Sequence, residues 1–553
     1  MNKLLFSFLL FLTSTTLFSQ LLDNDVNFTK ADTLRGSLRP ERTCFDVTFY
    51  DLHLDIQFDS KSIRGYNEIY FKAIKPSTKL QIDLFSNLLI DSVLMNGNSL
   101  NYKREFDAVF IELNHPMLVN EAYRMKVYYH GSPVQAKRAP WDGGFVWTKD
   151  SLGNDWLGVA CEGTGASLWW PNKDHLSDEP DSMRVTCIYP KNLEFVGNGR
   201  KTNERISDDF KSTTWSTSYP INNYNVTLNI GNYSHFQDVY VSKIDGRKLE
   251  LDYYVLPYNL EKAKNQFKQV KPMMEVYEKY LGPYPFWNDG YALVETPYLG
   301  MEHQGAIAYG NKYLNGYLGR DFSRIGLQFD YIIIHESGHE WWGNAVSAQD
   351  IADLWIHEGF CTYSESVYVE GMYGKSKAQE YINAKKSTVS NKSPIRGVVG
   401  VNNEGDGDMY NKGMLILNTL RHIVKNDSLW FYMLKDMSQN TFKNKPTNYD
   451  EVVSYFSKMT RKNVRPFFEQ YVKYAGIPEL YYRFETKSKY NKIFYFKWKT
   501  DVKGFSMPIY YTLNGKSDFQ YATDEWRSVS LNIKKVKKLV FDQEHYYINV
   551  REY

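Results

Sequence analysis

The sequence predicts a multidomain α+β protein: a β-rich N-terminal domain, a mainly helical central domain and a small C-terminal β-sandwich. Three observations lead to this fold class. The chain has 553 residues, more than the roughly 250 to 300 at which a single hydrophobic core stops growing. The apolar pattern changes from alternation to helical spacing near residue 246. After residue 478, short β-rich segments recur about every ten residues.

The first residues predict export. "MNKLLFSFLLFLTSTTLFSQ" has one Lys, an apolar run from Leu4 to Leu12 and then small polar residues, which is typical of a signal peptide. The run is shorter than the roughly 20 residues that span a bilayer. We therefore expect residues 1–19 to be removed, residues 20–39 to form a polar leader, and the mature chain to be periplasmic or secreted, without an integral membrane segment.

The net charge bears on the class of partner, and the number of cysteines bears on disulfide bonds. The 66 basic and 64 acidic residues nearly cancel, which argues against nucleic acid or an anionic membrane as the partner. The 4 cysteines are too few for a disulfide framework in a chain of 553 residues. Cys161 and Cys187 are the only pair that we consider. The sequence does not indicate an oligomeric state.

The three domains are predicted from periodicity. Residues 40–245 alternate apolar and polar positions in short runs separated by turn signals such as "MNGN", which predicts strands. Residues 246–478 begin with the helical spacing of "NLEKAKNQFKQVKPMMEVYEKYLG". Residues 479–553 contain the segments "ELYYRFETK", "KIFYFKWKT", "PIYYTL", "SVSLNI" and "KLVFD", which predict a small sandwich.

The stretch "YIIIHESGHEWWGNAV" contains an HExxH pattern, from His335 to His339. Residues four apart lie on one face of a helix, so both imidazoles can reach one zinc ion while Glu336 points at its water. A catalytic zinc site needs a third protein ligand. Glu358 follows His339 after eighteen residues, at the start of another helical run. His357 competes, but neighbours on a helix point about 100° apart, and we favour Glu358.

Other segments then make a resemblance specific. "HESGHEWWGNAV" followed by "DLWIHEGFCTYSE" resembles the aminopeptidase N family of zinc metallopeptidases (gluzincins), which includes leukotriene hydrolase. "LGMEHQGAIAYG" is similar to the family's G-x-M-E-N motif, "YNKG" to its Y-x-K-G, and "CEGTGASLWWPNKDHLSDEPD" to a segment with an amine-binding glutamate. The matches extend over roughly residues 40 to 480.

The resemblance implies a fold and its limits. We expect a saddle-like N-terminal β domain, a thermolysin-like catalytic domain and the small sandwich, without the large helical C-terminal domain of longer relatives. The chain looks like a shorter, bacterial-type secreted member. Two positions depart from the family: His303 replaces the Asn of G-x-M-E-N, and Ala160 stands where Gln is frequent.

The resemblance also implies an activity: zinc-dependent hydrolysis of the N-terminal peptide bond of peptides with a free N-terminus. One zinc ion would be held by His335, His339 and Glu358. Glu336 would act as general base on the zinc-activated water and then as acid, and Tyr410 would donate to the oxyanion. The residues implied to bind substrate are Glu302 and Glu162 at its ammonium group and Gly300 and Met301 along its main chain.

Several alternatives remain open from the sequence. The zinc site also suits an epoxide hydrolase like leukotriene hydrolase, and the fold could serve a non-catalytic peptide-binding scaffold; Glu302 argues against an endopeptidase. Asp353 is the partner that we consider for a zinc-bound imidazole, because such ligands usually donate their second N–H to a carboxylate or carbonyl.

Overall fold

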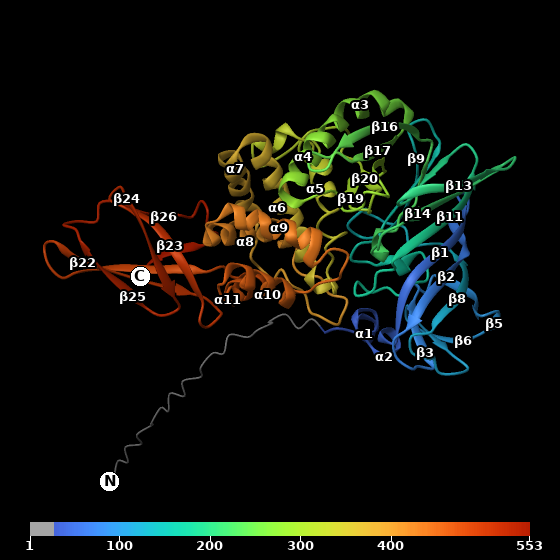
Figure 1. Ribbon diagram of the computed structural model, residues 1–553, viewed down its shortest axis with the longest axis horizontal. Coiled ribbons are helices and arrows are strands. Elements are labelled where there is room, and N and C mark those ends of the chain that lie inside the picture. Colours follow the sequence, from blue (N-terminus) through green and yellow to red (C-terminus); the bar gives the residue numbers. More distant parts are fainter. Residues whose placement is uncertain (1–26) are drawn as a thin grey trace, which may run out of the picture.

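A computed structural model describes residues 27–553 (Figure 1). The predicted signal peptide, residues 1–19, lies outside the described residues. The described part of the predicted leader contains a helix, α1 (Lys30–Gly36), followed by α2 (Pro40–Thr43). α1 begins with a capping box formed by Thr29 and Asp32, and Leu34 is buried. The main-chain oxygens of Leu34 and Gly36 accept hydrogen bonds from Gln81 and His175, so α1 is attached to the β-rich region that follows.

The N-terminal region is built from three sheets, as its alternating pattern predicts. In the eight-stranded sheet, of order β13-β14-β11-β1-β2-β8-β4-β5, only the β1–β11 pair is parallel. Its strands are β1 (Phe45–Gln57), β2 (Ser62–Ala73), β4 (Leu88–Met95), β5 (Asn98–Ser99), β8 (Ala122–Gly131), β11 (Ser182–Pro190), β13 (Arg200–Ile206) and β14 (Phe210–Thr217). The smaller sheets contain β3 (Lys79–Asp83), β6 (Asn101–Glu105) and β7 (Ala108–Glu112), and β9 (Gly144–Lys149), β10 (Asp155–Ala160), β12 (Glu194–Val196) and β15 (Asn229–Gly231).

The central region combines one sheet with most of the helices. The sheet has the order β16-β17-β18-β20-β19, with β16 (Ser234–Val241), β17 (Lys248–Val255), β18 (Tyr291–Glu295), β19 (Gly300–Met301) and β20 (Ile307–Tyr309). The helices are α3 (Leu260–Gln266), α4 (Val270–Leu281), α5 (Tyr331–Gly338), α6 (Trp355–Tyr373), α7 (Lys375–Lys385), α8 (Met409–Val424), α9 (Asp427–Asp436), α10 (Tyr449–Thr460) and α11 (Arg465–Lys473). The predicted domain limits stay a prediction. The limit predicted after residue 245 lies in the turn of the β16–β17 hairpin.

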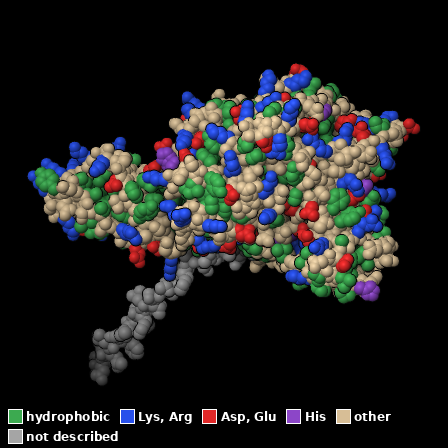
Figure 2. All heavy atoms as spheres, viewed as in Figure 1, with side chains coloured by type: hydrophobic (Ala, Val, Ile, Leu, Met, Phe, Trp, Pro, Cys, Tyr) green, Lys and Arg blue, Asp and Glu red, His purple; other side chains and the backbone are tan. Residues whose placement is uncertain are grey.

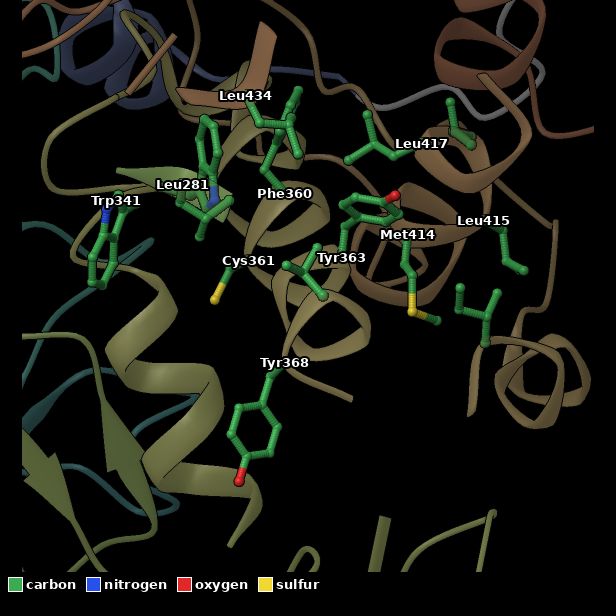
Figure 3. Close-up of a cluster of buried hydrophobic side chains, with 14 of the residues drawn as sticks. Leu281, Trp341, Phe360, Cys361, Tyr363, Tyr368, Met414, Leu415, Leu417 and Leu434 are labelled. Atoms are coloured by element: carbon green, nitrogen blue, oxygen red, sulfur yellow. The ribbon is translucent and has the colours of Figure 1, made fainter. Parts of the chain in front are cut away.

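Helix α6 forms the centre of the helical core. Figure 3 shows Phe360, Cys361, Tyr363 and Tyr368 of α6 between the segment of Trp341 and the α8 side chains. α6 and α8 approach closely because a glycine of each faces the other: a Cβ on Gly413 would lie 2.5 Å from the Cα of Gly359. The core therefore fixes α8 against α6.

Seven strands form the C-terminal region, which lies at the end of the molecule away from the N-terminal sheets (Figure 1). They are β21 (Glu479–Thr486), β22 (Asn491–Lys499), β23 (Ser506–Leu513), β24 (Lys516–Thr523), β25 (Arg527–Asn532), β26 (Leu539–Phe541) and β27 (Asn549–Glu552), in two sheets. In residues 27–553 no helix follows α11. The prediction of β-rich, helical and β-rich regions in this order is confirmed.

The surface charge, the helices and the cysteines can be compared with what the sequence predicts. Basic and acidic side chains are interspersed over the face in Figure 2. None of the helices between residues 27 and 553 combines the length and apolar character needed to cross a bilayer. All four cysteines are buried free thiols, so Cys161 and Cys187, the pair considered from the sequence, are not bonded to each other.

Candidate active site

Helix α5 carries the HExxH pattern and is fixed at its start. Asp330 caps it by accepting from the main-chain N–H groups of Ile332 and Ile333. Asp330 also accepts from Tyr309 and Asn311, and it is fully buried. The three isoleucines before His335 are buried as well. The helix therefore has little freedom to move its functional side chains.

Three donor atoms converge where α5 ends and α6 begins. The Nε2 atoms of His335 and His339 lie 3.3 Å apart. Glu358 Oε2 lies 3.5 Å from the first and 3.4 Å from the second. All three side chains are at least 95% buried. The structure thus brings together the three residues that the sequence predicts as metal ligands.

The donor set fits zinc. Tetrahedral zinc with ligands at about 2.0 to 2.1 Å has donor atoms roughly 3.3 to 3.4 Å apart, close to the spacing found here. Glu358 Oε2 is buried and has no hydrogen-bond partner within the described chain, and such an oxygen requires a cation or a donor. Two imidazoles and one carboxylate also form one of the common catalytic zinc sets.

Each imidazole is oriented by its other nitrogen. His335 Nδ1 donates to Glu365 Oε1 at 2.7 Å, and Tyr381 donates to Glu365 Oε2 at 2.5 Å. His339 Nδ1 donates to the carbonyl of Trp342 at 2.8 Å. Both rings therefore present Nε2 to the centre.

Glu365, rather than Asp353, orients His335, and the interpretation of Asp353 was wrong. Asp353 is bound by Arg396 at 2.7 and 3.0 Å and by the Tyr449 N–H, which commits its carboxylate to a structural ion pair. Glu365 was not predicted from the sequence. It lies seven residues after Glu358 on α6, two helical turns along the same face, and that spacing was the available signal.

His357 faces away from the metal donors. Its Nε2 accepts from the Ala348 N–H at 2.7 Å, and its Nδ1 lies 3.3 Å from the Tyr224 hydroxyl. Burial lowers the pKa of His357 to about 3, so the ring is neutral and its Nδ1–H donates to Tyr224. Tyr224 donates in turn to Glu302 at 3.2 Å.

The side chain of Glu336 extends from α5 toward Gly300 of the edge strand β19. Burial raises the pKa of its carboxyl to about 7. A Cβ on Gly300 would lie 2.7 Å from Glu336 Oε1, so only glycine allows this approach. β19 pairs antiparallel with β20 on one side only, and its other edge borders the cleft. Gly300 and Met301 are thus placed where an extended peptide can add to the sheet.

Tyr410 faces the donor set from α8. Its ring lies 6.0 Å from that of His335, at an interplanar angle of 22°. Burial, together with the charges of Glu358 and Glu162, raises the pKa of Tyr410 well above its ordinary value, so the phenol stays a hydrogen-bond donor. Lys412 holds the start of α8 by donating to the carbonyls of Tyr474 and Ala475.

Two further carboxylates lie beside the centre. Carboxylate oxygens of Glu302 and Glu358 and a nitrogen of His339 lie within 4.8 Å of one another. Burial, followed by the charge of Glu302, raises the pKa of Glu162 well above its ordinary value, and Glu162 Oε1 is buried without a partner among the described residues. Within residues 27–553 neither carboxylate forms an ion pair, so the pair is free to accept hydrogen bonds from a charged donor.

The two positions that depart from the family lie next to this pair. Ala160 is buried at the end of β10. His303 is fully buried, and neither of its ring nitrogens has a partner within residues 27–553. Burial lowers the pKa of His303 to about 3. The ring is therefore neutral and presents no charge beside Glu302.

The three metal donors, Glu336, Tyr410 and the substrate-binding candidates Glu162, Gly300, Met301 and Glu302 line one cleft of about 1210 Å³, which is large enough for a peptide. The N-terminal β-rich region supplies Pro140, Trp141, Glu162, Gly163 and Thr164. The central region supplies the edge strand, the metal donors, Glu336 and Tyr410, and further residues of the loop after β20, of α7 and of the segment before α8. The site is built between the two regions.

Comparison with known proteins agrees with this geometry. Residues 265–471 match the model of the peptidase family M1 domain. Over 513 residues the chain is 24% identical to a protein named probable aminopeptidase 2 from Sulfurisphaera tokodaii, covering 88% of this chain and 62% of that protein. It is 20% identical over 453 residues to a leucyl aminopeptidase from Saccharolobus solfataricus, covering 78% and 54%.

A solved structure is similar as well. The structure of a mutant M1 zinc metallopeptidase from Deinococcus radiodurans, bound to a Tyr-Ser-Ala substrate, has a TM-score of 0.65 and 20% identity, covering 80% of this chain and 98% of that one. The likeness supports the fold. The chain spans less than two thirds of the length of the two curated relatives.

Proposed function

We propose that this chain, whose residues 265–471 match the model of the peptidase family M1 domain, is a zinc-dependent aminopeptidase that removes the first residue from peptides with a free N-terminus. One observation carries the proposal. A pair of carboxylates without a cation, Glu302 and Glu162, lies beside a donor set suited to zinc. The carboxylate pair supports recognition of an ammonium group, and the donor set supports hydrolysis.

His335, His339 and Glu358 would hold a single zinc ion. When bound, zinc supplies polarisation of the scissile carbonyl and lowers the pKa of a bound water toward about 7. Glu365 and the Trp342 carbonyl keep the two imidazoles turned toward the ion.

Glu336 would accept the proton of the attacking water and deliver it to the leaving amine. Its burial against Gly300 supports this role, because a pKa of about 7 lets the carboxyl both take and give a proton near neutrality. The balance is complete: water adds across the C–N bond, and the proton that Glu336 takes leaves with the amine.

Tyr410 would donate a hydrogen bond to the carbonyl oxygen as that oxygen gains negative charge. A phenol whose pKa is raised well above its ordinary value remains protonated at neutral pH, which suits a donor. One such donor is typically worth on the order of 10² to 10³ in rate.

Glu302 and Glu162 would bind the substrate's ammonium group, with Gly300 and Met301 along its main chain. Tyr224 donates to Glu302 and so orients its carboxylate. Because this receptor lies beside the metal donors, only the bond next to a free amino end would reach the reacting centre. This arrangement supports an aminopeptidase over an endopeptidase.

Export is part of the proposal. The signal-peptide pattern of residues 1–19 supports a periplasmic or secreted enzyme. N-terminal sequencing of the mature protein after fractionation of the producing cells tests it: we expect a start near residue 20, outside the cytoplasm. An intact Met1 in the cytoplasmic fraction would contradict export.

The activity is tested with a panel of aminoacyl anilides and their N-acetylated counterparts. We expect hydrolysis of the free amines only, its loss with a chelator and its return with zinc. Glu336→Gln should keep stoichiometric zinc by elemental analysis while losing turnover by at least about 10². Equal cleavage of the acetylated substrates, or turnover that survives metal removal, would overturn the proposal.

A further inference from the structure

Arg320 gives the cleft a positive charge outside the group of carboxylates at the metal donors. Glu162, Glu302, Glu336 and Glu358 line it near the metal donors, whereas Arg320 lines it from the loop after β20. The Arg320 residue is exposed. This separation of charge suggests a ligand with unlike charges at its two ends.

A tight turn presents Arg320 to the cleft. The Tyr317 N–H donates to the Arg320 carbonyl at 2.8 Å, and the Arg320 N–H to the Tyr317 carbonyl at 3.1 Å. Between them, Leu318 and Gly319 have φ values of 50° and 83°, as a two-residue type I′ turn requires. Residues directly opposite in an antiparallel pair project side chains to the same face, and Tyr317 and Arg320 both line the cleft.

Hydrogen bonds to neighbouring segments hold the turn in place. Gly316 donates to the Phe329 carbonyl at 2.7 Å. The Asn311 side chain donates to the Gly316 carbonyl at 2.8 Å and accepts from the Leu318 N–H at 2.8 Å. A Cβ on Gly316 would lie 2.6 Å from the Arg320 carbonyl. Arg320 is therefore carried by a preorganised turn, which lowers the entropic cost of using it.

The carboxylate next to Arg320 in the chain does not neutralise it. The adjacent Asp321 is committed elsewhere: its Oδ2 lies 3.0 Å from Lys385 Nζ and its Oδ1 accepts from Ser323 at 2.7 Å. The Lys385 and Asp321 side chains are 8% and 2% exposed, so this ion pair is buried. Between residues 27 and 553, Arg320 forms no ion pair within 4.0 Å.

Helix α5 extends between the turn that carries Arg320 and the neighbourhood of Glu302, and its length sets the scale of their separation. Glu302 lies beside His339, at the C-terminal end of α5. The turn lies at the other end, where the Tyr331 N–H donates to the Gly316 carbonyl at 3.4 Å. His339 follows Tyr331 by eight residues, which is about 12 Å along the axis. An extended peptide advances roughly 3.3 Å per residue, so about three to four residues cover this length.

We propose that Arg320 binds the C-terminal carboxylate of short peptides, so that the cleft selects tripeptides and tetrapeptides by both of their charged ends. The inference rests on the proposed aminopeptidase function and names its substrate class. Arg320 acts here as a specificity residue that does not touch the reacting atoms. A guanidinium suits this role because it pairs with a carboxylate through two parallel N–H donors.

The test compares tripeptides of the form X-Ala-Ala as the free acid and as the C-terminal amide, where X is the residue best released in the anilide panel. We expect kcat/KM for the acid to exceed that for the amide by about three- to tenfold, the range of an exposed to partly desolvated charge pair. In Arg320→Gln the acid-to-amide ratio should fall to near 1.

Arg324→Gln is the matched control. Arg324 is an exposed arginine of the same loop that is not among the residues lining the cleft, so this variant should keep the ratio of the unaltered protein. The preference should also weaken at high salt and disappear for peptides of ten residues. A ratio near 1 in the unaltered protein, or one that persists in Arg320→Gln, would overturn the inference.

Binding separates this inference from the proposed activity. Calorimetry on Glu336→Gln with the same two tripeptides needs no turnover, and it should show the same acid preference and its loss when Arg320→Gln is added. If no substrate is hydrolysed but this preference is found, the activity fails and the carboxylate site stands. If anilides are hydrolysed and the preference is absent, the reverse holds.

Discussion

The two imidazoles of the donor set each depend on one residue outside it. His335 is oriented by Glu365 and His339 by the Trp342 carbonyl. In a neutral imidazole the nitrogen that donates a hydrogen bond leaves the other free as a ligand. These contacts decide that both Nε2 atoms face Glu358, so removing one should weaken metal binding without touching a ligand.

Replacing Glu365 by Gln tests this dependence. We expect zinc affinity, measured by competition with a chromophoric chelator, to fall about 10- to 100-fold. Asp353→Asn is the control, because Asp353 is an equally buried carboxylate that pairs with Arg396 instead. That variant should lose thermal stability and keep its zinc affinity. The reverse pattern would reassign the orienting role to Asp353.

Tyr410→Phe isolates the hydroxyl that faces the donors. The ring packing against His335 is retained, so the fold and metal content should not change. We expect kcat to fall on the order of 10² to 10³, with a smaller change in KM, because the lost hydrogen bond strengthens in the transition state. If steady-state kinetics show KM rising while kcat is kept, Tyr410 contributes to substrate binding alone.

At the scale of elements, the crossing of α6 and α8 sets the distance between Tyr410 and Glu358. The two helices meet at Gly359 and Gly413, one residue after Glu358 and three residues after Tyr410. The glycines of "EGF" and "YNKG" thus have a packing reason: a Cβ on Gly413 would force the backbones apart, and one on Gly359 would lie only 3.2 Å from Gly413 Cα. Burial of the surrounding side chains then holds the crossing rigid (Figure 3).

Gly413→Ala should disturb both stability and turnover. The added Cβ would lie 2.5 Å from Gly359 Cα, and overpacking of this kind typically costs about 1 to 3 kcal/mol. We expect a lower melting temperature and a lower kcat, since α8 must shift with Tyr410. Gly476→Ala is the control, because its Cβ would meet only Asp501 at 3.7 Å. Unchanged stability in Gly413→Ala would mean that the helices separate without strain.

At the scale of the whole molecule, the cleft requires both the N-terminal β-rich region and the central region. Glu162 and Tyr224 come from the first, and the metal donors come from the second. Many charged and polar groups are buried in consequence, and their protonation links the stability of the protein to pH. His303, buried and without a hydrogen-bond partner in the described chain, is one group whose contribution can be isolated.

The sign of that contribution follows from the lowered pKa. Folded His303 has a pKa of about 3, whereas an unfolded histidine titrates near 6.5. Above about pH 6.5 the residue is neutral in both states, so its titration does not change the free energy of unfolding. Below that pH the free energy of unfolding falls, because the unfolded chain then binds a proton that the folded chain does not. By pH 5 the loss is about 2 kcal/mol.

His303→Asn removes this titration and inserts the residue typical of the resembled family. Thermal melts of both proteins at pH 7 and pH 5 measure the effect. We expect the melting temperature of the unaltered protein to fall further between these pH values than that of the variant. Parallel shifts would show that His303 does not titrate between the two states.

The order of the three regions and a candidate metal-binding pattern could be predicted from the amino-acid sequence. The apolar periodicity of an element depends on which of its faces is buried, and this pattern is present within a short segment of the sequence. His335 and His339 share a face because of their spacing, and the third ligand was narrowed to Glu358 or its neighbour His357. Tyr410, Glu302 and Glu162 came from the resemblance alone, since none of them is distinguished by periodicity.

Which residues complete the site depends on contacts that exist only in the folded chain. Glu365 orients His335, Asp353 does not, and His357 faces Tyr224. The contact of Gly359 with Gly413 likewise joins segments about 50 residues apart in the chain, and the place of Arg320 on the cleft depends on how the loop after β20 folds. Such relations depend on how helices cross and where loops fold back, and the packing that sets them is a property of the whole core, which no single segment encodes.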